Sequence, residues 1–258
     1  MKVVYYDGKQ WWKRGKFLVH TKKERETWEH AIIIQGVTRI KTRTFSNCPK
    51  LVKVTMASSV TVISEFAFCG CKLLREIIWS ENIELIKASA FFRCTSLPKT
   101  LVIPKRCFRI CESAFQFCSS ITSLFIPFEC EDVDDSAFDH CSSLKIVVLS
   151  STTDIGSEVF KATKLFELSP FDTYDNESFE AWLRQRFVWY PLHQICASQE
   201  PSLEEIYNLL TNQGTDILNV EDDIGAKAME YFNVNPNVEY TQWGIMRIFV
   251  LRMMGQCA

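Results

Sequence analysis

The chain has 258 residues, of which 29 are lysine or arginine and 31 are aspartate or glutamate, so its net charge at pH 7 is −2. Apolar residues make up 47% and charged residues 23%, proportions that fit a folded protein and exclude wholesale disorder. No run of about 18 apolar residues predicts a membrane span, and no cluster of lysine and arginine predicts nucleic-acid binding.

Residues 1–27 are predicted to form an N-terminal cap. The β-prone segment Val3-Val4-Tyr5-Tyr6 precedes Asp7-Gly8, which is typical of a tight turn, and the turn precedes Trp11-Trp12. We therefore expect a small hairpin that covers the open end of the repeats that follow, because repeat arrays need capped ends. The alternative is that these aromatic residues belong to a peptide-binding module.

Residues 28–172 repeat with a period of about 23, as half a unit followed by six full units. The most regular column is Phe45, Phe68, Phe91, Phe115, Phe138 and Phe160. Cysteine follows three residues later in the first five units, and Thr163 takes its place in the sixth. A leucine or isoleucine comes next, and then an alternating apolar pair such as Val54 and Met56. One unit carries an extra residue between Leu97 and Leu101.

Each unit is too short to bury its own apolar side chains, so we expect the units to stack, with like residues on top of one another. The alternating pairs then form short strands side by side in one parallel sheet. The pattern V-x-x-I-x-x-x-A-F-x-x-C-x-x-L-x-x-I-x-I-P resembles the BspA-type (Treponema pallidum-like) leucine-rich repeat. The resemblance implies a curved solenoid with a mostly irregular or short-helical convex side, and a surface that binds other molecules.

Residues 173–258 leave this period and are predicted to be helical. Phe179, Trp182 and Leu183 follow helical spacing after Asn176. The segments Pro191-Leu192-His193 and Leu209-Leu210-Thr-Asn-Gln-Gly214 resemble an ankyrin repeat, although Ala228-Met229-Glu230 replaces the second Pro-Leu-His. The resemblance implies a degenerate ankyrin-like segment. Because so few units cannot bury a core alone, we expect it to dock on the leucine-rich array.

The sequence predicts no enzyme, no cofactor and no metal site, since it lacks phosphate-binding, dinucleotide-binding, metalloprotease and serine-hydrolase motifs. Of the 11 cysteines, five form the repeat column; Cys107 and Cys130 share a column with valine and isoleucine, which indicates buried packing. Zinc binding near Cys69-Gly-Cys71 and disulfides between stacked cysteines are open alternatives. The odd cysteine count favours reduced thiols in the cytoplasm, as does the stretch Met1-Lys2-Val3-Val4-Tyr5-Tyr6-Asp7, which meets a charge too early for the apolar core of a signal peptide.

The candidate binding site is the outward face of the strands, where residues between two buried positions point away from the core. The central column is almost wholly apolar: Ile32, Thr55, Ile78, Val102, Phe125 and Val148. If this column faces water, it forms a stripe of the kind that marks partner sites. The alternatives are strand propensity alone, and a stripe that the N-terminal cap or the C-terminal helices partly cover.

These features predict a non-enzymatic protein–protein interaction scaffold that binds other proteins through the exposed sheet face. A cell-surface adhesion or matrix-binding protein is the alternative. Both repeat resemblances imply protein partners by analogy of fold.

Overall fold

The computed structural model describes residues 2–9, 11–13, 16–17, 22–150, 152–185, 205–206 and 227. The chain divides into two compact units, one formed by residues 1–167 and 171–176 and the other by 168–170 and 177–258. The boundaries at residues 27 and 172 stay predictions, since the two units interleave between residues 167 and 177.

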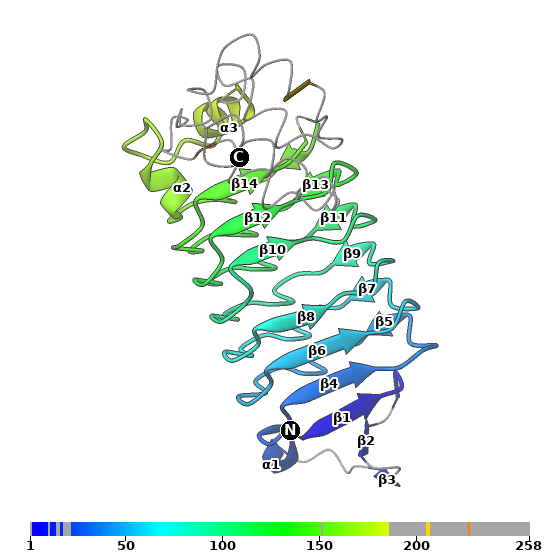
Figure 1. Cartoon of the computed structure of the whole chain (residues 1–258). Coiled ribbons are helices and arrows are strands. Elements are labelled where there is room, and N and C mark those ends of the chain that lie inside the picture. Colours follow the sequence, from blue (N-terminus) through cyan, green and yellow to red (C-terminus); the bar gives the residue numbers. More distant parts are fainter. Residues whose placement is uncertain are drawn as a thin grey trace, which may run out of the picture. The chain divides into compact units, whose positions relative to one another are not determined.

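The first unit is a parallel β-solenoid of about six turns, whose first wall is built from the alternating apolar pairs (Figure 1). Its strands are β4 (His30–Ile33), β6 (Lys53–Met56), β8 (Glu76–Ile78), β10 (Thr100–Val102), β12 (Ser123–Phe125) and β14 (Ile146–Val148). Neighbouring strands pair in parallel with the register of the repeat, as His30 with Lys53 and Lys53 with Glu76. The predicted parallel strands are confirmed.

A second wall carries two-residue strands that sequence analysis did not predict. They are β5 (Arg39–Ile40), β7 (Val62–Ile63), β9 (Leu85–Ile86), β11 (Arg109–Ile110), β13 (Asp132–Val133) and β15 (Asp154–Ile155), and they form one continuous parallel sheet. The predicted irregular side is therefore partly a sheet, because the buried Ile or Val before each phenylalanine lies in these strands. Turns occupy the rest of each repeat.

The N-terminal hairpin is present and extends the first wall. β1 (Val3–Tyr6) pairs antiparallel with β2 (Trp11–Lys13), and β2 pairs with β3 (Lys16–Phe17). β1 also pairs in parallel with β4, and α1 (Lys22–Arg25) precedes β4. The rings of Tyr6 and Trp28 meet Phe45 edge-on, with centroids 6.0 and 6.4 Å away, so they cover the first ring of the repeat column.

The phenylalanine column lies in single file through the core, as predicted. Consecutive rings from Phe45 to Phe138 are nearly parallel, with centroids 5.0 to 5.2 Å apart, and Phe160 follows at 6.0 Å. All six side chains are buried. The cysteine thiols bond to the same column: Cys71 Sγ donates to the carbonyl oxygen of Phe45 at 3.0 Å, and Cys94, Cys118 and Cys141 repeat the contact with Phe68, Phe91 and Phe115.

Each turn around a phenylalanine contains two residues in the left-handed backbone region. The two columns are Arg43, Phe66, Ser89, Ser113, Ser136, Glu158 and Asn47, Gly70, Arg93, Phe117, His140, Ala162. This conformation is unfavourable for residues other than glycine. The left-handed conformation directs backbone N–H groups toward the next turn. Phe66 donates to the Ala88 oxygen at 3.1 Å, and Phe117 donates to the Asp139 oxygen at 3.0 Å.

The prediction of a single sheet is wrong for the first wall, which is split between β8 and β10. β8 ends a six-stranded sheet that begins with β3, and β10 begins a separate three-stranded sheet. The split falls at the 24-residue unit, where the extra residue accompanies Pro98, which has no backbone N–H to donate. The second wall continues without a break past the same turn, since β9 pairs with β11.

The column of repeat cysteines ends at Thr163, whose hydroxyl donates to the Phe160 oxygen and accepts from the Phe166 N–H at the start of α2 (Lys164–Glu167).

The second unit contains most of α3 (Asn176–Gln185), the helix predicted from Phe179 and Leu183, both of which are buried. The ankyrin-like segment and its docking fall outside the described residues, apart from residues 205, 206 and 227. No helix in the described part of the chain is long and apolar enough to span a bilayer.

Replacing Phe91 with Ala removes a fully buried ring from the middle of the column, so we expect the free energy of unfolding to fall by about 3–5 kcal/mol. Urea denaturation followed by circular dichroism measures the loss. The matched control is Phe108→Ala, since that ring is 41% exposed and its removal leaves no comparable cavity. Equal losses for the two variants would contradict a core organised around the column.

Candidate functional site

The structure aligns the predicted outward column in two groups of three residues. Parallel pairing places Ile32 beside Thr55 and Thr55 beside Ile78. Across the split, Val102 lies beside Phe125, and Phe125 beside Val148. The predicted spacing therefore produces the column, but it is not continuous.

Accessibility differs sharply along the column. Ile78 is 45% exposed, and Ile32, Thr55 and Val102 are half-buried. Phe125 and Val148 are only 2% and 1% exposed, so neither is available to a partner in this conformation. The accessible part of the column therefore lies on β4, β6, β8 and β10.

Apolar surface is concentrated on β8. Ile77 and Trp79 occupy the alternating inward positions of their turn, and both are half-buried. The same positions in the turns of β6, β10 and β12, such as Val54 and Met56, are 4% exposed or less, whereas Leu149 after β14 is also half-buried. The extra exposure follows from the split, because β10 does not lie against this edge of β8 as a paired strand.

The polar side chains beside Ile78 are already paired with one another. Lys53 forms an ion pair with Glu76, and His30 Nε2 lies 2.9 Å from Thr55 Oγ1. Burial lowers the pKa of His30 and the positive charge of Lys53 lowers it further, so the ring is neutral at pH 7. These two pairs thus carry no net charge, which suits contact of Ile78 with an apolar side chain.

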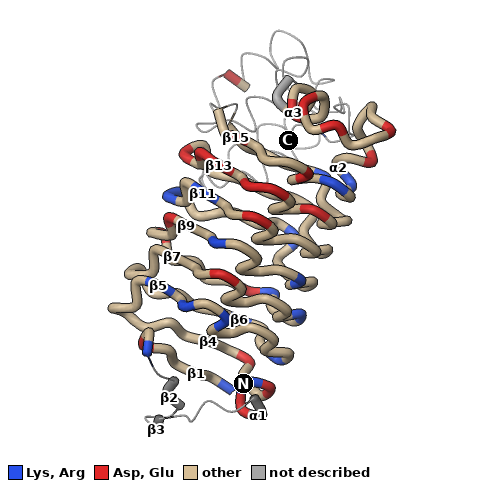
Figure 2. Tube along the Cα trace, turned by 180° about the vertical axis from the view of Figure 1, so that it is seen from behind, with Lys and Arg blue, Asp and Glu red and all other residues tan. Residues whose placement is uncertain are grey.

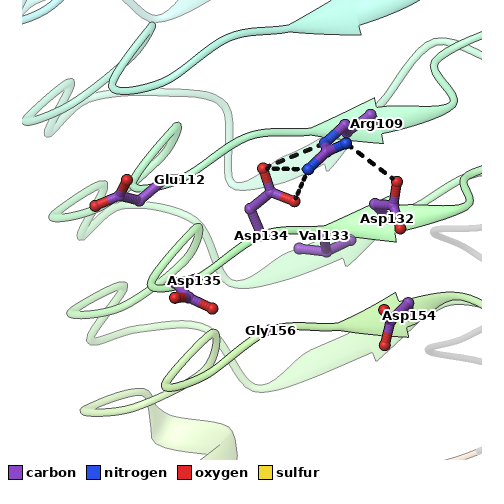
Figure 3. A pocket seen from close by; sticks show the side chains of 8 residues that line it. All are labelled: Arg109, Glu112, Asp132, Val133, Asp134, Asp135, Asp154 and Gly156. Carbon is purple, nitrogen blue, oxygen red and sulfur yellow. Dashed lines mark hydrogen bonds and ion pairs between the residues drawn. The ribbon is translucent and has the colours of Figure 1, made fainter.

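The second wall carries a separate acidic hollow of about 390 Å³. Arg109 is the single cation in its lining, and it bonds to Asp134 at 3.0 Å and approaches Asp132 at 3.6 Å (Figure 3). The bonds to Asp134 raise the pKa of Arg109. The remaining lining comes from Glu112, Val133, Asp135, Asp154 and Gly156. Figure 2 shows acidic residues gathered near β13 and basic ones near β5.

Sequence analysis did not predict this hollow, because its carboxylates come from three turns and only stacking brings them together. Gly156 is required beside it, since a Cβ there would lie 2.5 Å from Asp135 Oδ1. That oxygen also accepts the backbone N–H of Ser157 at 2.7 Å. Within the described ranges, no group of three His, Cys, Asp or Glu residues is arranged to hold a metal ion.

The cysteines serve packing rather than ligation where they are described. Cys71 donates to its carbonyl partner in the core, whereas Cys69 is half-buried, and neither belongs to a metal-binding group in the described part of the chain. Burial raises the pKa of Cys130 and of Cys141 to about 12, which keeps both thiols protonated and weakly nucleophilic. All nine described cysteines are free thiols.

His140 does not form a nucleophile pair with the adjacent Cys141, which is buried and bonded to the Phe115 oxygen. Its Nδ1 lies 2.7 Å from Oδ1 of Asp139, a buried carboxylate that also accepts from Gln116 Nε2 at 2.7 Å. The His140 ring packs on Phe117 at 4.5 Å. This surface contact tightens the stack of turns, and the sequence alone gives no signal for it.

A family model described as the BspA type leucine-rich repeat region matches residues 32–167 in six copies. The chain is similar to a leucine-rich cell surface protein of Faecalibacterium prausnitzii, with 34% identity over 47% of this chain and 32% of that one, and a TM-score of 0.45. It is similar to a leucine-rich repeat protein of T. pallidum, with 25% identity over 52% and 76% of the two chains and a TM-score of 0.38.

A leucine-rich repeat protein of Eubacterium ventriosum is 22% identical over 58% of this chain and 40% of that one, with a TM-score of 0.47. The chain spans about a third of the length of the Faecalibacterium protein. No curated protein matches it.

Thiol reactivity tests the placement of the cysteines. In a background with Cys196→Ser and Cys257→Ser, we expect Ellman's reagent to modify only the half-buried Cys69 and Cys111 in the folded protein, and slowly, because burial raises the pKa of both. All nine described thiols should react after unfolding in guanidinium. Rapid reaction of the buried column, a loss of free thiols without added oxidant, or stoichiometric zinc in the purified protein would contradict this assignment.

Proposed function

Since the chain belongs to the BspA-type leucine-rich repeat family, we propose that it is a non-enzymatic scaffold that binds other proteins through the accessible face of its first wall. Proteins of this family are generally interaction or surface proteins and generally lack catalytic activity. The observation that carries the proposal is the 45% exposure of Ile78, an apolar side chain in the outward column of a parallel sheet, next to the half-buried Thr55. Contiguous exposed apolar surface favours a partner site.

The proposed contact surface, which we name the β8 patch, consists of the outward-facing residues Ile32, Thr55, Ile78 and Val102. Its side chains come from four successive turns, so a partner would contact several repeats at once. The patch is flanked by polar pairs that are already formed, which limits the cost of desolvating charge when a partner binds.

The finer parts of the proposal concern location and the second unit. We place the chain in the cytoplasm on the strength of its odd number of cysteines and its buried, unpaired thiol column. The ankyrin-like character of residues 173–258 and the cap role of residues 1–27 belong to the same proposal. The buried Phe179 and Leu183 of α3 support a packed helical segment.

Ile78→Asp tests the proposal by placing a charge at the centre of the β8 patch. Affinity capture with mass spectrometry identifies partners of the unaltered chain, and calorimetry with each purified partner measures affinity. We expect Ile78→Asp to weaken binding by about 30-fold, as loss of a central contact residue does.

Leu73→Asp is the matched control, because Leu73 is 50% exposed in the same repeat but lies outside the strand. It should leave affinity unchanged. Thermal unfolding of both variants separates lost binding from lost folding. Equal affinities for Ile78→Asp and the unaltered chain would contradict a partner site on this face.

A further inference from the structure

The split in the first wall has a local cause. In the column where each turn begins its strand, backbone N–H groups donate to the previous turn, as from Arg75 to the Val52 oxygen at 3.0 Å and from Thr122 to the Lys99 oxygen at 2.8 Å. Within the described part of the chain, Lys99 makes no such bond to Arg75. Pro98 and the extra residue displace the start of β10, so its register with β8 is lost.

The core and the second wall are unchanged at this turn, so the split affects the first wall alone. Phe91 stacks at 5.1 Å on both Phe68 and Phe115, and β9 pairs with β11 behind them. The core and the second wall therefore run through this turn with the same spacing as elsewhere. Opening is confined to the backbone edges of β8 and β10.

Both edges carry hydrogen-bonding groups that face the split. Alternate residues of a parallel strand direct their backbone groups to opposite neighbours. Glu76 donates to β6 through the Val52 oxygen, so the N–H and C=O of Ile77 point toward β10. An edge of this kind is a template for an added strand.

The side chains around the edge of β8 indicate which residue types an added strand would need. Ile78 and the half-buried Trp79 offer apolar contacts, and Trp79 is held edge-on against Phe91 at 5.6 Å. Arg75 and Lys99 occupy the same column in successive turns, and both are exposed at the start of the split. Two cations at this end favour an acidic residue in the ligand, whereas Glu76 is neutralised by Lys53.

We propose that the split between β8 and β10 binds a short extended peptide segment of a partner protein by strand addition. The segment pairs its backbone with the free edge of β8 at Ile77, places apolar side chains on Ile78 and Trp79, and directs an acidic residue to Arg75 and Lys99. This inference rests on the proposed interaction function and names the kind of partner that the β8 patch takes.

The probe is a fluorescein-labelled peptide, Asp-Glu-Val-Thr-Val-Thr-Ile, measured by fluorescence anisotropy with the full chain. We expect saturable binding with a Kd below about 1 mM. Two further peptides carry N-methyl groups on alternate residues, so that each blocks the N–H groups along one edge of the peptide strand. The peptide that is methylated on the edge facing β8 should bind at least about tenfold more weakly, and the peptide methylated on the other edge should bind normally. Hydrogen exchange at Ile77 should slow when peptide is bound. No saturable binding, or full binding by both methylated peptides, overturns the proposal.

Deletion of Pro98 restores the 23-residue spacing and should let β8 and β10 pair, so we expect it to abolish peptide binding while the thermal stability is retained. Arg75→Glu with Lys99→Glu should weaken binding about tenfold, and the exposed control Lys50→Glu should not. Concentration-dependent dimerisation that deletion of Pro98 removes would assign the edge to a second copy and overturn the peptide assignment. A captured partner that loses affinity for Ile78→Asp but not for the Pro98 deletion would retain the scaffold function and reject strand addition.

Discussion

Stacking of the phenylalanine column sets the distance between turns, and every other element adopts that distance. Ring centroids lie 5.0 to 5.2 Å apart through the first five units, close to the roughly 4.8 Å between neighbouring strands in a sheet. Because the two spacings agree, core rings and backbone ladders can repeat together in the same register. The bonds from Phe68 N–H to the Ala90 oxygen and from Cys94 Sγ to the Phe68 oxygen pair the buried backbone groups of each ring.

The same constraint explains the left-handed residues on either side of each ring. Phe66 and Phe117 are large side chains in a backbone region that glycine favours, and of the twelve such positions in the repeats only Gly70 is glycine. In the first five turns each strained residue donates an N–H to the following turn, as Ser113 does to the Asp135 oxygen at 3.0 Å. Pairing a buried group offsets a conformational cost of about 1 kcal/mol or more. Strain is thus distributed evenly along the solenoid.

Features that recur in every repeat could be predicted from the sequence, whereas features that depend on contacts between particular turns could not. The strands, the buried phenylalanines and the packing role of Cys107 follow from columns that any one unit displays. The burial of Phe125 and Val148 does not, because residues of one column differ in exposure from turn to turn. The acidic hollow around Arg109 likewise exists only after stacking brings three turns together. The short second-wall strands were missed because two residues give too little alternation to indicate a strand.

The split at Pro98 shows how one position in an array of similar repeats can become distinct from the others. An insertion in the core column would break the stack at Phe91, whereas an insertion in one wall removes only the short ladder between β8 and β10. A free sheet edge invites uncontrolled association, and charged residues at an edge oppose it. Arg75 and Lys99 lie at this edge, so a basic strand is disfavoured there and an acidic one is favoured. The edge is also only about three residues long, which restricts any added strand to a short segment and makes side-chain contacts with Ile78 and Trp79 decisive for its affinity.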